Sequence, residues 1–581
     1  MNENFFFDNF FFNFIPSFIF LIFNFFASIV LFKKNYIFKI NSINPFIIFS
    51  IIISFYVFLI NLLFLFNSTE YLQSAVFSLA FVTLLVLIIS YHSKFFSSFS
   101  EIISSFSEIK RNNKLIFAFL FVFFLISIMP ISDADSIALH LNIPGQIINY
   151  KELNNDLTKN LENILISNTE SLLTLSYVFK SDNFGSQLNF FALFIFFIIF
   201  RKNKFFFYLL LCSPLIIFFV STQKLQLFFG LLYLNLFILV YENRLKSNFD
   251  FFLFIFLLTF YSSGKLTYIL FSIFLFLFFL FKNKKSLKII FLFLLISFFF
   301  HQFPILLYKF IIFDNPFTPL LSYDFKDQEI LSAFAHSIRA SEGWLGNFTP
   351  TMIFRPFIVF NISTLTTIFG LAFIFLLFDF KRIRQLYFLP YLIIISILSL
   401  GQLLPRYFLE AFLLMAFYAN YKKIYKVINI FQGFFVILFS VVFLFYSFFY
   451  LQKGSWLKKD FYRKFTYTYL NSELLKKKKI TENILVVAFD RDSIFFDKNV
   501  YSTRYINVLT SFNGQYQENL KKFIKDANIK FIIFDNSSRV NDCIVVDIFD
   551  EINFKRATRN YLINEKEYNF KIGKIVKNDC K

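Results

Sequence analysis

Ionisable side chains gather at the start of a long polar segment, residues 133–186, which lies between two apolar runs. The segment opens SDADSIALHLNIPGQIINY, so Asp133 and Asp135 follow the first run directly and His140 comes shortly after them. Carboxylates at positions i and i+2 do not share a helix face, but in an extended segment both can converge on one cation or one hydroxyl. The alternative is structural, because Asp135 is well placed to cap a helix that begins at Ser136. In that case the stretch IALHLNIPGQII would lie along the membrane interface, with His140 near the carboxylates.

Three more ionisable residues are candidates for binding a substrate. Lys265 and Arg406 lie at the ends of apolar runs, from which both could reach the phosphate of a lipid, Arg406 through two parallel hydrogen bonds. The alternative for both is extension to lipid headgroups, which is common at helix ends. Glu170, in the segment SNTESLL, is either a second acid of the site or a solvated loop residue. We assign no function to Lys224 and His301, which lie at other ends of apolar runs.

The elements that must position these residues are membrane spans. The chain has 581 residues, of which 57% are hydrophobic and 16% are charged, whereas globular proteins average about 45–50% and about 25%. This composition excludes a soluble protein. Uncharged runs of the ~20 residues that cross a bilayer as a helix occur, for example, at 44–66 and 428–450. We predict an α-helical polytopic membrane protein with about 14 transmembrane helices, at 10–32, 44–66, 74–91, 114–132, 187–200, 205–220, 225–241, 250–262, 265–281, 286–301, 357–379, 386–403, 407–420 and 428–450.

Lysine and arginine residues alternate along the predicted connections. Every odd-numbered connection is basic, whereas the even-numbered ones are short or carry more acids than bases. Because cytoplasmic loops carry the excess of positive charge, we expect the N-terminus, the long connections 133–186 and 302–356, and the tail to be extracytoplasmic, in a multi-pass protein of the inner (plasma) membrane. Basic residues just after the last span, such as Lys458 and Arg463, favour the opposite side for the tail, but long domains cross a membrane largely regardless of charge.

The last part of the chain, 452–581, has a different composition and is predicted to be a small extracytoplasmic α/β domain. Short branched runs at 484–489, 530–534 and 543–549 indicate strands, and QENLKKFIKDA at 517–527 indicates an amphipathic helix. The domain shows no group of residues typical of a catalytic site. The chain has a net charge of +20, but the basic residues here are spread rather than clustered into a patch, so we expect no nucleic-acid partner.

Several short motifs follow one another in a fixed order along the chain. They are D-A-D with a nearby His at 133–140, then SNTESLL, SSGKLT at 262–267, DNPFTPLL and PRYFLEAF. This order resembles the GT-C superfamily of polytopic glycosyltransferases, which includes protein O-mannosyltransferases and lipid A aminoarabinose transferases. The likeness covers 114–450, which would form a GT-C-like core with the two long external loops. The three spans within 1–113 precede that core and depart from the usual arrangement, and ALH stands where many relatives carry an aromatic residue before His.

The resemblance implies an inverting glycosyltransferase that moves a sugar from a polyprenyl-phosphate donor to a lipid, glycan or protein acceptor. Its base would be Asp133, and Asp135 would be the partner of that base or the ligand of a divalent cation, Mg²⁺ or Mn²⁺. The residues expected to bind substrate are His140, Glu170, Lys265 and Arg406. No nucleotide site is needed, and SSGKLT lacks the first glycine of a phosphate-binding P-loop.

Two other functions are compatible with the same features. A lipid-linked oligosaccharide polymerase or ligase would rely on arginines of the second long loop, where Arg339 and Arg355 are available. A transporter of a lipid or polysaccharide, without transferase activity, would usually show an internal repeat, and we find none between the two halves of the chain.

Overall fold

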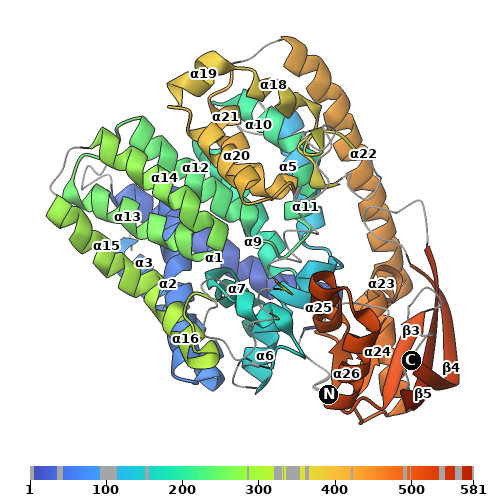
Figure 1. The fold of residues 1–581 in the computed structure, drawn as a ribbon. Coiled ribbons are helices and arrows are strands. Elements are labelled where there is room, and N and C mark those ends of the chain that lie inside the picture. Colours follow the sequence, from blue (N-terminus) through green and yellow to red (C-terminus); the bar gives the residue numbers. More distant parts are fainter. Residues whose placement is uncertain are drawn as a thin grey trace.

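The computed structural model is mostly helical, with a small sheet near the end of the chain (Figure 1). Two masses are visible in it, a large group of apolar helices and, beside one end of that group, the tail domain. The structure describes residues 6–35, 43–91, 114–150, 153, 156–283, 287–318, 330, 333–334, 354–359, 366–420, 423–487, 494–496, 499–535, 544–556 and 566–578.

Several helices are long and apolar enough to cross a membrane. Four helices of the described chain meet this condition by length and composition, and a fifth is added if the pair α15 and α16, bent by 50°, counts as one span. The four are α1 (Phe10–Asn35), α2 (Pro45–Leu65), α3 (Leu72–Tyr91) and α22 (Lys423–Lys453), and the bent pair is α15 (Leu287–His301) with α16 (Phe303–Phe313). These helices indicate a membrane protein.

The other predicted spans are shorter helices or are interrupted. Six apolar helices in the described ranges have 10–17 residues: α5 (Lys114–Ser127), α9 (Phe184–Phe200), α12 (Gln226–Tyr241), α13 (Asn248–Ser263), α14 (Leu266–Lys282) and α20 (Leu389–Ser399). The run 205–220 divides at Ser213 into α10 (Lys204–Leu211) and α11 (Pro214–Phe219), because Pro214 has no N–H to continue a helix.

Two further predicted spans contain only short helices in their described parts. The run 357–379 holds η7 (Leu371–Phe373) and α18 (Ile374–Leu377), and α19 (Phe380–Gln385) follows it. The run 407–420 contains the end of η8 (Pro405–Phe408) and α21 (Leu409–Phe417). Hydropathy therefore located the apolar segments but overestimated the length of several helices.

Helix α12 lies at the centre of the helical group. Every residue of α12 from Gln226 to Val240 is buried, and the helix packs against α9, α13 and α21. A helix that is apolar on all sides is typical of such a central position. The N-terminal helices belong to the same group, since α1 packs against α9, and α2 packs against α7 (Asn168–Leu173) and α16.

The first long connection folds into a helical cap over one end of this group. It contains the π-helical turn Ser136–His140, α6 (Asn142–Tyr150), the 3-10 turn Leu161–Leu165, α7 and α8 (Leu175–Val178). The helix expected after Ser136 is present, but its expected position is wrong. Residues 140–147 are all buried in the protein, so this stretch does not lie along an interface with one exposed face.

The tail domain combines helices with a five-stranded sheet of order β2-β1-β3-β5-β4. Its elements are α23 (Lys458–Phe465), α24 (Tyr467–Lys478), β1 (Ile484–Val486), β2 (Val500–Ser502), α25 (Arg504–Asn513), α26 (Tyr516–Asp526), β3 (Phe531–Asp535), β4 (Ile544–Arg556) and β5 (Lys566–Asn578). The three predicted strands and the predicted helix are present. Strands β1, β2 and β3 are parallel, and β5 pairs antiparallel with β3 and with β4.

The tail domain packs on the same face of the helical group as the first long connection (Figure 1). The side chain of Arg504, in the tail, lies 2.9 Å from Glu162, in the connection. The first residues of the described chain contact both of these parts. The N–H of Phe10 donates to the carbonyl of Trp456, and the N–H of Phe7 donates to the carbonyl of Lys180. Three distant parts of the sequence thus meet on one face.

Candidate functional site

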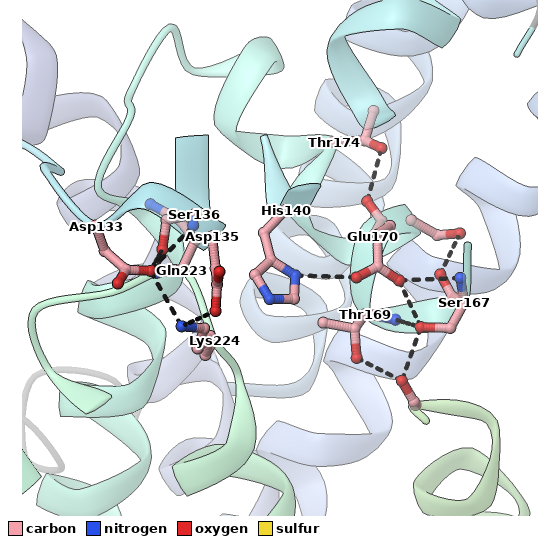
Figure 2. A network of polar contacts seen from close by, with 12 residues as sticks. Asp133, Asp135, Ser136, His140, Ser167, Thr169, Glu170, Thr174, Gln223 and Lys224 are labelled. Atoms are coloured by element: carbon pink, nitrogen blue, oxygen red, sulfur yellow. Dashed lines mark hydrogen bonds and ion pairs between the residues drawn. The ribbon is translucent and has the colours of Figure 1, made fainter. Parts of the chain in front are cut away.

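Lys224 lies between the two carboxylates that the sequence singled out. Its Nζ is 3.1 Å from Oδ2 of Asp133 and 2.7 Å from Oδ2 of Asp135 (Figure 2). Arg406, in the 3-10 turn η8 just before α21, adds a second cation, with a guanidinium nitrogen 3.6 Å from Oδ2 of Asp135. We call Asp133, Asp135, Lys224 and Arg406 the polar centre. Its formal charges cancel.

Local structure fixes the orientation of Asp133. Its Oδ2 accepts hydrogen bonds from the backbone N–H of Ser136, at 3.0 Å, and from the Ser136 hydroxyl, at 2.9 Å. Asp133 is therefore the residue that caps the π-helical turn, and the expectation that Asp135 is this cap is wrong: its side chain makes no capping bond to the turn. Figure 2 shows the other oxygen of Asp133 directed away from these contacts, and no described residue bonds to it.

The two carboxylates are more accessible than the lysine that holds them. The side chains of Asp133 and Asp135 are 21% and 26% exposed, whereas that of Lys224 is 4% exposed. Burial by itself would raise the pKa of Asp133, but the Lys224 ammonium and the bonds from Ser136 outweigh it, so the pKa lies below its ordinary value of 3.8. Asp133 is thus an ionised carboxylate whose hydrogen bonds from described residues all go to Oδ2.

A second pair of ionisable residues lies beside the polar centre. Nδ1 of His140 is 3.0 Å from Oε1 of Glu170, and both side chains are almost fully buried. Oε2 of Glu170 accepts from the N–H and the hydroxyl of Ser167, at 2.9 and 2.5 Å, which closes the capping box of α7. The prediction that Glu170 is a solvated loop residue is therefore wrong (Figure 2).

The His140–Glu170 pair has a defined protonation state. Burial lowers the pKa of His140 from its ordinary value of 6.5, although the neighbouring carboxylate opposes this. Burial works against ionisation of Glu170 too, but the bonds from His140 and Ser167 hold its pKa below the ordinary value. Neutral His140 therefore donates its Nδ1–H to ionised Glu170, and the lone pair on its Nε2 is available as a hydrogen-bond acceptor.

The turn that carries Lys265 is attached to the same helix. The hydroxyls of Ser167 and Thr169 both donate to the carbonyl of Gly264, each at 2.7 Å. Lys265 follows directly, and its positive charge lowers the pKa of both His140 and Glu170. Lys265 therefore lies close to the buried pair, while Arg406 lies at the carboxylates.

The structure brings all six predicted site residues into two adjacent groups. Asp133, Asp135 and Arg406 belong to the polar centre, and His140, Glu170 and Lys265 lie beside it. The sequence interpretation missed Lys224, because a lysine at the end of an apolar run usually extends to lipid headgroups. It also missed Glu410 in PRYFLEAF, which is 2% exposed and accepts a hydrogen bond from the Tyr261 hydroxyl at 3.0 Å.

His301 contrasts with these residues. Its ring is 1% exposed, packs against Phe256 and Phe300, and has no hydrogen-bond partner on either nitrogen in the part of the chain that the structure describes. Nothing about its contacts links it to the polar centre, in keeping with the absence of a functional assignment.

The residues of the polar centre do not fit the divalent cation expected at Asp135. The position between the two carboxylates, where a metal would bind, is taken by the Lys224 ammonium. In the described ranges no three His, Cys, Asp or Glu side chains form a group suited to a metal, whereas Mg²⁺ and Mn²⁺ require several oxygen ligands. We therefore derive no step that uses a metal.

Comparison with known proteins does not identify the function of this chain. No protein-family model, no curated protein and no solved structure matches the chain. The arguments available are the contacts and charges of the polar centre, the buried pair next to it, and the apolar helices that carry them.

Proposed function

We propose that the chain is a membrane-embedded glycosyltransferase that transfers a sugar from a polyprenyl-phosphate donor to a hydroxyl group of a lipid, glycan or protein acceptor. The observation that carries this proposal is the polar centre itself. Lys224 contacts both carboxylates and Arg406 contacts Asp135, at one end of an apolar helical group. Charged groups so close to apolar spans are costly, and they therefore mark candidate functional sites.

Asp133 is the proposed base. Ser136 and Lys224 hold Oδ2 of Asp133, so the carboxylate is fixed in place. Its other oxygen, Oδ1, is the atom that would accept the proton of the acceptor hydroxyl. In the proposed step the acceptor oxygen bonds to the anomeric carbon, and the bond from that carbon to the phosphate oxygen breaks on the opposite face. The acceptor proton passes to Oδ1 of Asp133, and polyprenyl phosphate leaves with the electron pair.

Cations near the base would bind the phosphate. Arg406, 16% exposed, contacts Asp135, and a guanidinium is the side-chain group best suited to binding phosphate oxygens. Lys265 lies close enough to Glu170 to lower the pKa of its carboxyl group. Asp135, between Lys224 and Arg406, keeps both cations in position. The His140–Glu170 pair offers a neutral acceptor for a sugar hydroxyl.

The membrane setting of the proposal is the one expected from the sequence. About 14 apolar segments would form a GT-C-like unit in the inner (plasma) membrane, with the polar centre, the first long connection and the tail on the extracytoplasmic side. The long apolar helices and the common face of these three parts support this arrangement.

The test is Asp133→Asn, which keeps the shape of the side chain and an acceptor oxygen for Ser136 but removes the base. In membranes supplied with a radiolabelled polyprenyl-phosphate hexose, we expect transfer to endogenous acceptors to fall about 10²–10⁴-fold with normal protein abundance. The matched control is Asp156→Asn, in the same connection, where the carboxylate caps the turn at Thr158. Full transfer by Asp133→Asn would show that Asp133 is not the base.

A transporter is the second candidate, and Glu410 is the observation that favours it. This carboxyl group is buried within α21 and is bonded to Tyr261 of α13. Carboxyl groups inside membrane helices often belong to ion or proton pathways. Substrate flux in sealed vesicles that is lost in Glu410→Gln but kept in Asp133→Asn would favour transport over transfer. For a polymerase or ligase, Arg355 is exposed and Arg339 lies outside the described residues.

A further inference from the structure

The tail domain contacts the turn on which the polar centre is built. Ala138, in the π-helical turn between Asp135 and His140, is 1% exposed, and it lies in an apolar cluster whose other buried members all belong to the tail. Those members are Leu474, Leu475, Ile484, Val486, Val500, Ile533, Phe570 and Ile572. The tail domain therefore packs directly against the π-helical turn.

A second contact joins the tail to Asp182, at the end of the first long connection. The Asp182 carboxylate is 1% exposed and accepts hydrogen bonds from the Asn13 amide, at 2.6 Å, and from the Tyr462 hydroxyl. The ammonium of Lys458, 2% exposed, lies 3.5 Å from the same carboxylate and donates to Asn13 Oδ1 at 2.8 Å. A buried carboxylate of the connection is thus neutralised by a lysine of the tail.

Gln223 connects Asp182 to the polar centre. The side-chain amide of Gln223 donates to the carbonyl of Asp182, and its Oε1 accepts from the N–H of Gly185 at 2.7 Å. The backbone N–H of Gln223 donates to the Ser136 hydroxyl at 2.9 Å, and that hydroxyl donates to Asp133 at 2.9 Å. Gln223 is 0% exposed, and the next residue along the chain is Lys224.

We propose that the tail domain is a positioning element of the polar centre. Lys458 and Tyr462 fix Asp182, Asp182 fixes Gln223, and Gln223 in turn fixes the backbone of Lys224. Lys458 is thus a positioning residue that acts on the carboxylates through others. Because it concerns the shape of the site, this inference goes beyond the proposed transferase and holds for any reaction or transport that the polar centre supports.

The test uses two buried cysteines as reporters in the full-length protein. Thr222→Cys places the first reporter beside Gln223. Thr222 is 1% exposed, and its hydroxyl has no hydrogen-bond partner in the described part of the chain, so the exchange breaks no bond. The natural Cys212, 3% exposed in the helical group, is the second and reports general unfolding. Cys543 and Cys580 are changed to serine, and labelling of purified protein by N-ethylmaleimide is followed by mass spectrometry.

We expect Lys458→Met to expose the turn without opening the helical group. The labelling rate at position 222 should rise about tenfold or more, because local opening becomes easier when a buried ion pair is lost, while the rate at Cys212 changes less than about twofold. Lys458→Arg keeps the charge and should restore most of the protection. Lys459→Met, at an exposed neighbouring position, is the matched control and should change neither rate.

Two outcomes would overturn the proposal. In one, Lys458→Met folds and position 222 stays protected; in the other, both cysteines become reactive to the same extent. If Lys458→Met does not accumulate, Tyr462→Phe removes only the hydroxyl that binds Asp182, and an unchanged rate at position 222 in that variant counts against the proposal equally. None of these results bears on the transferase, which is tested by Asp133→Asn.

Discussion

Lys224 contacts two carboxylates at once, and its loss should be costly. Lys224→Met would leave Asp133 and Asp135 side by side without their shared cation. Breaking a buried ion pair costs about 3–5 kcal/mol; because both carboxylates are partly exposed here, we expect about 2 kcal/mol at pH 7. Thermal or denaturant unfolding in detergent measures this loss. Lys202→Met, at an exposed helix end, should change stability by less than about 0.5 kcal/mol.

The cost of Lys224→Met should depend on pH in a known direction. The pKa of Asp133 in the folded protein is lowered from 3.8, above all by Lys224 acting against burial. The stability gained from this shift is present above pH 3.8 and is lost as the pH falls through the folded pKa. The difference between Lys224→Met and the unaltered protein should therefore shrink below about pH 4. A difference that stays constant down to pH 3 would contradict this account.

The His140–Glu170 bond can be measured by a double-mutant cycle. With His140→Ala, Glu170→Ala and the double variant, we expect a coupling free energy of about 1.5–3 kcal/mol, the value for a hydrogen bond to a charged group. The pKa of His140 is lowered from 6.5, so its contribution to stability is constant above pH 6.5 and declines as the pH falls below that value. His140→Ala should flatten this decline; an unchanged slope would mean that His140 is already charged.

Residue types and their order pointed to part of the candidate site from the sequence alone. Asp133, Asp135 and Arg406 were singled out because ionisable residues at a membrane face mark candidate sites and because they fall in the motifs D-A-D and PRYFLEAF. Lys224 was not singled out, since a single lysine at a helix end usually reaches headgroups, and its partner Asp133 lies 91 residues away in the sequence. The role of Glu170 in structure was readable, because S-x-x-E at Ser167 is a capping box.

Among the elements, position was easier to predict than length. Apolar runs placed α1, α2, α3 and α22 well, because nothing interrupts them. Inside the helical group the same signal could not separate a membrane span from a core helix such as α12, which is buried by its neighbours. The break before Pro214 was a visible signal in the sequence. The fold of the first long connection was not predictable, since it depends on contacts with the tail.

The close approach of α9 to the turn before α12 gives a prediction at Gly185. A Cβ atom at this position would overlap the side-chain oxygen of Gln223, which already accepts the Gly185 N–H. Gly185→Ala should therefore displace Gln223 and raise maleimide labelling at Thr222→Cys, as Lys458→Met does. Gly514→Ala is the control. Gly514 lies in the tail with open space around it and has a φ of 75°, so the exchange strains the backbone there but should leave labelling at position 222 unchanged.

For the whole molecule, the tail should be necessary for a stable core. A chain that ends at Lys453 would lack Lys458 and Tyr462 and leave Asp182 buried without its cation. We expect a loss of about 3–5 kcal/mol, visible as a lower unfolding temperature and poor recovery in size-exclusion chromatography. Asp182→Asn in the shortened chain removes the charge and should restore part of the loss. A shortened chain as stable as the full one would show that the two parts are independent.

The bond between Lys458 and Asn13, which spans 445 residues of sequence, also sets the order of events during biosynthesis. At about 5–20 residues per second, a ribosome needs roughly 20–90 s to extend the chain from one partner to the other. Asp182 is made 276 residues before Lys458, so for roughly the last 14–55 s of that interval its carboxylate has been made but its lysine has not. The contacts between the tail and the first long connection can therefore form only after synthesis is nearly complete, once Lys458 and Tyr462 have been made.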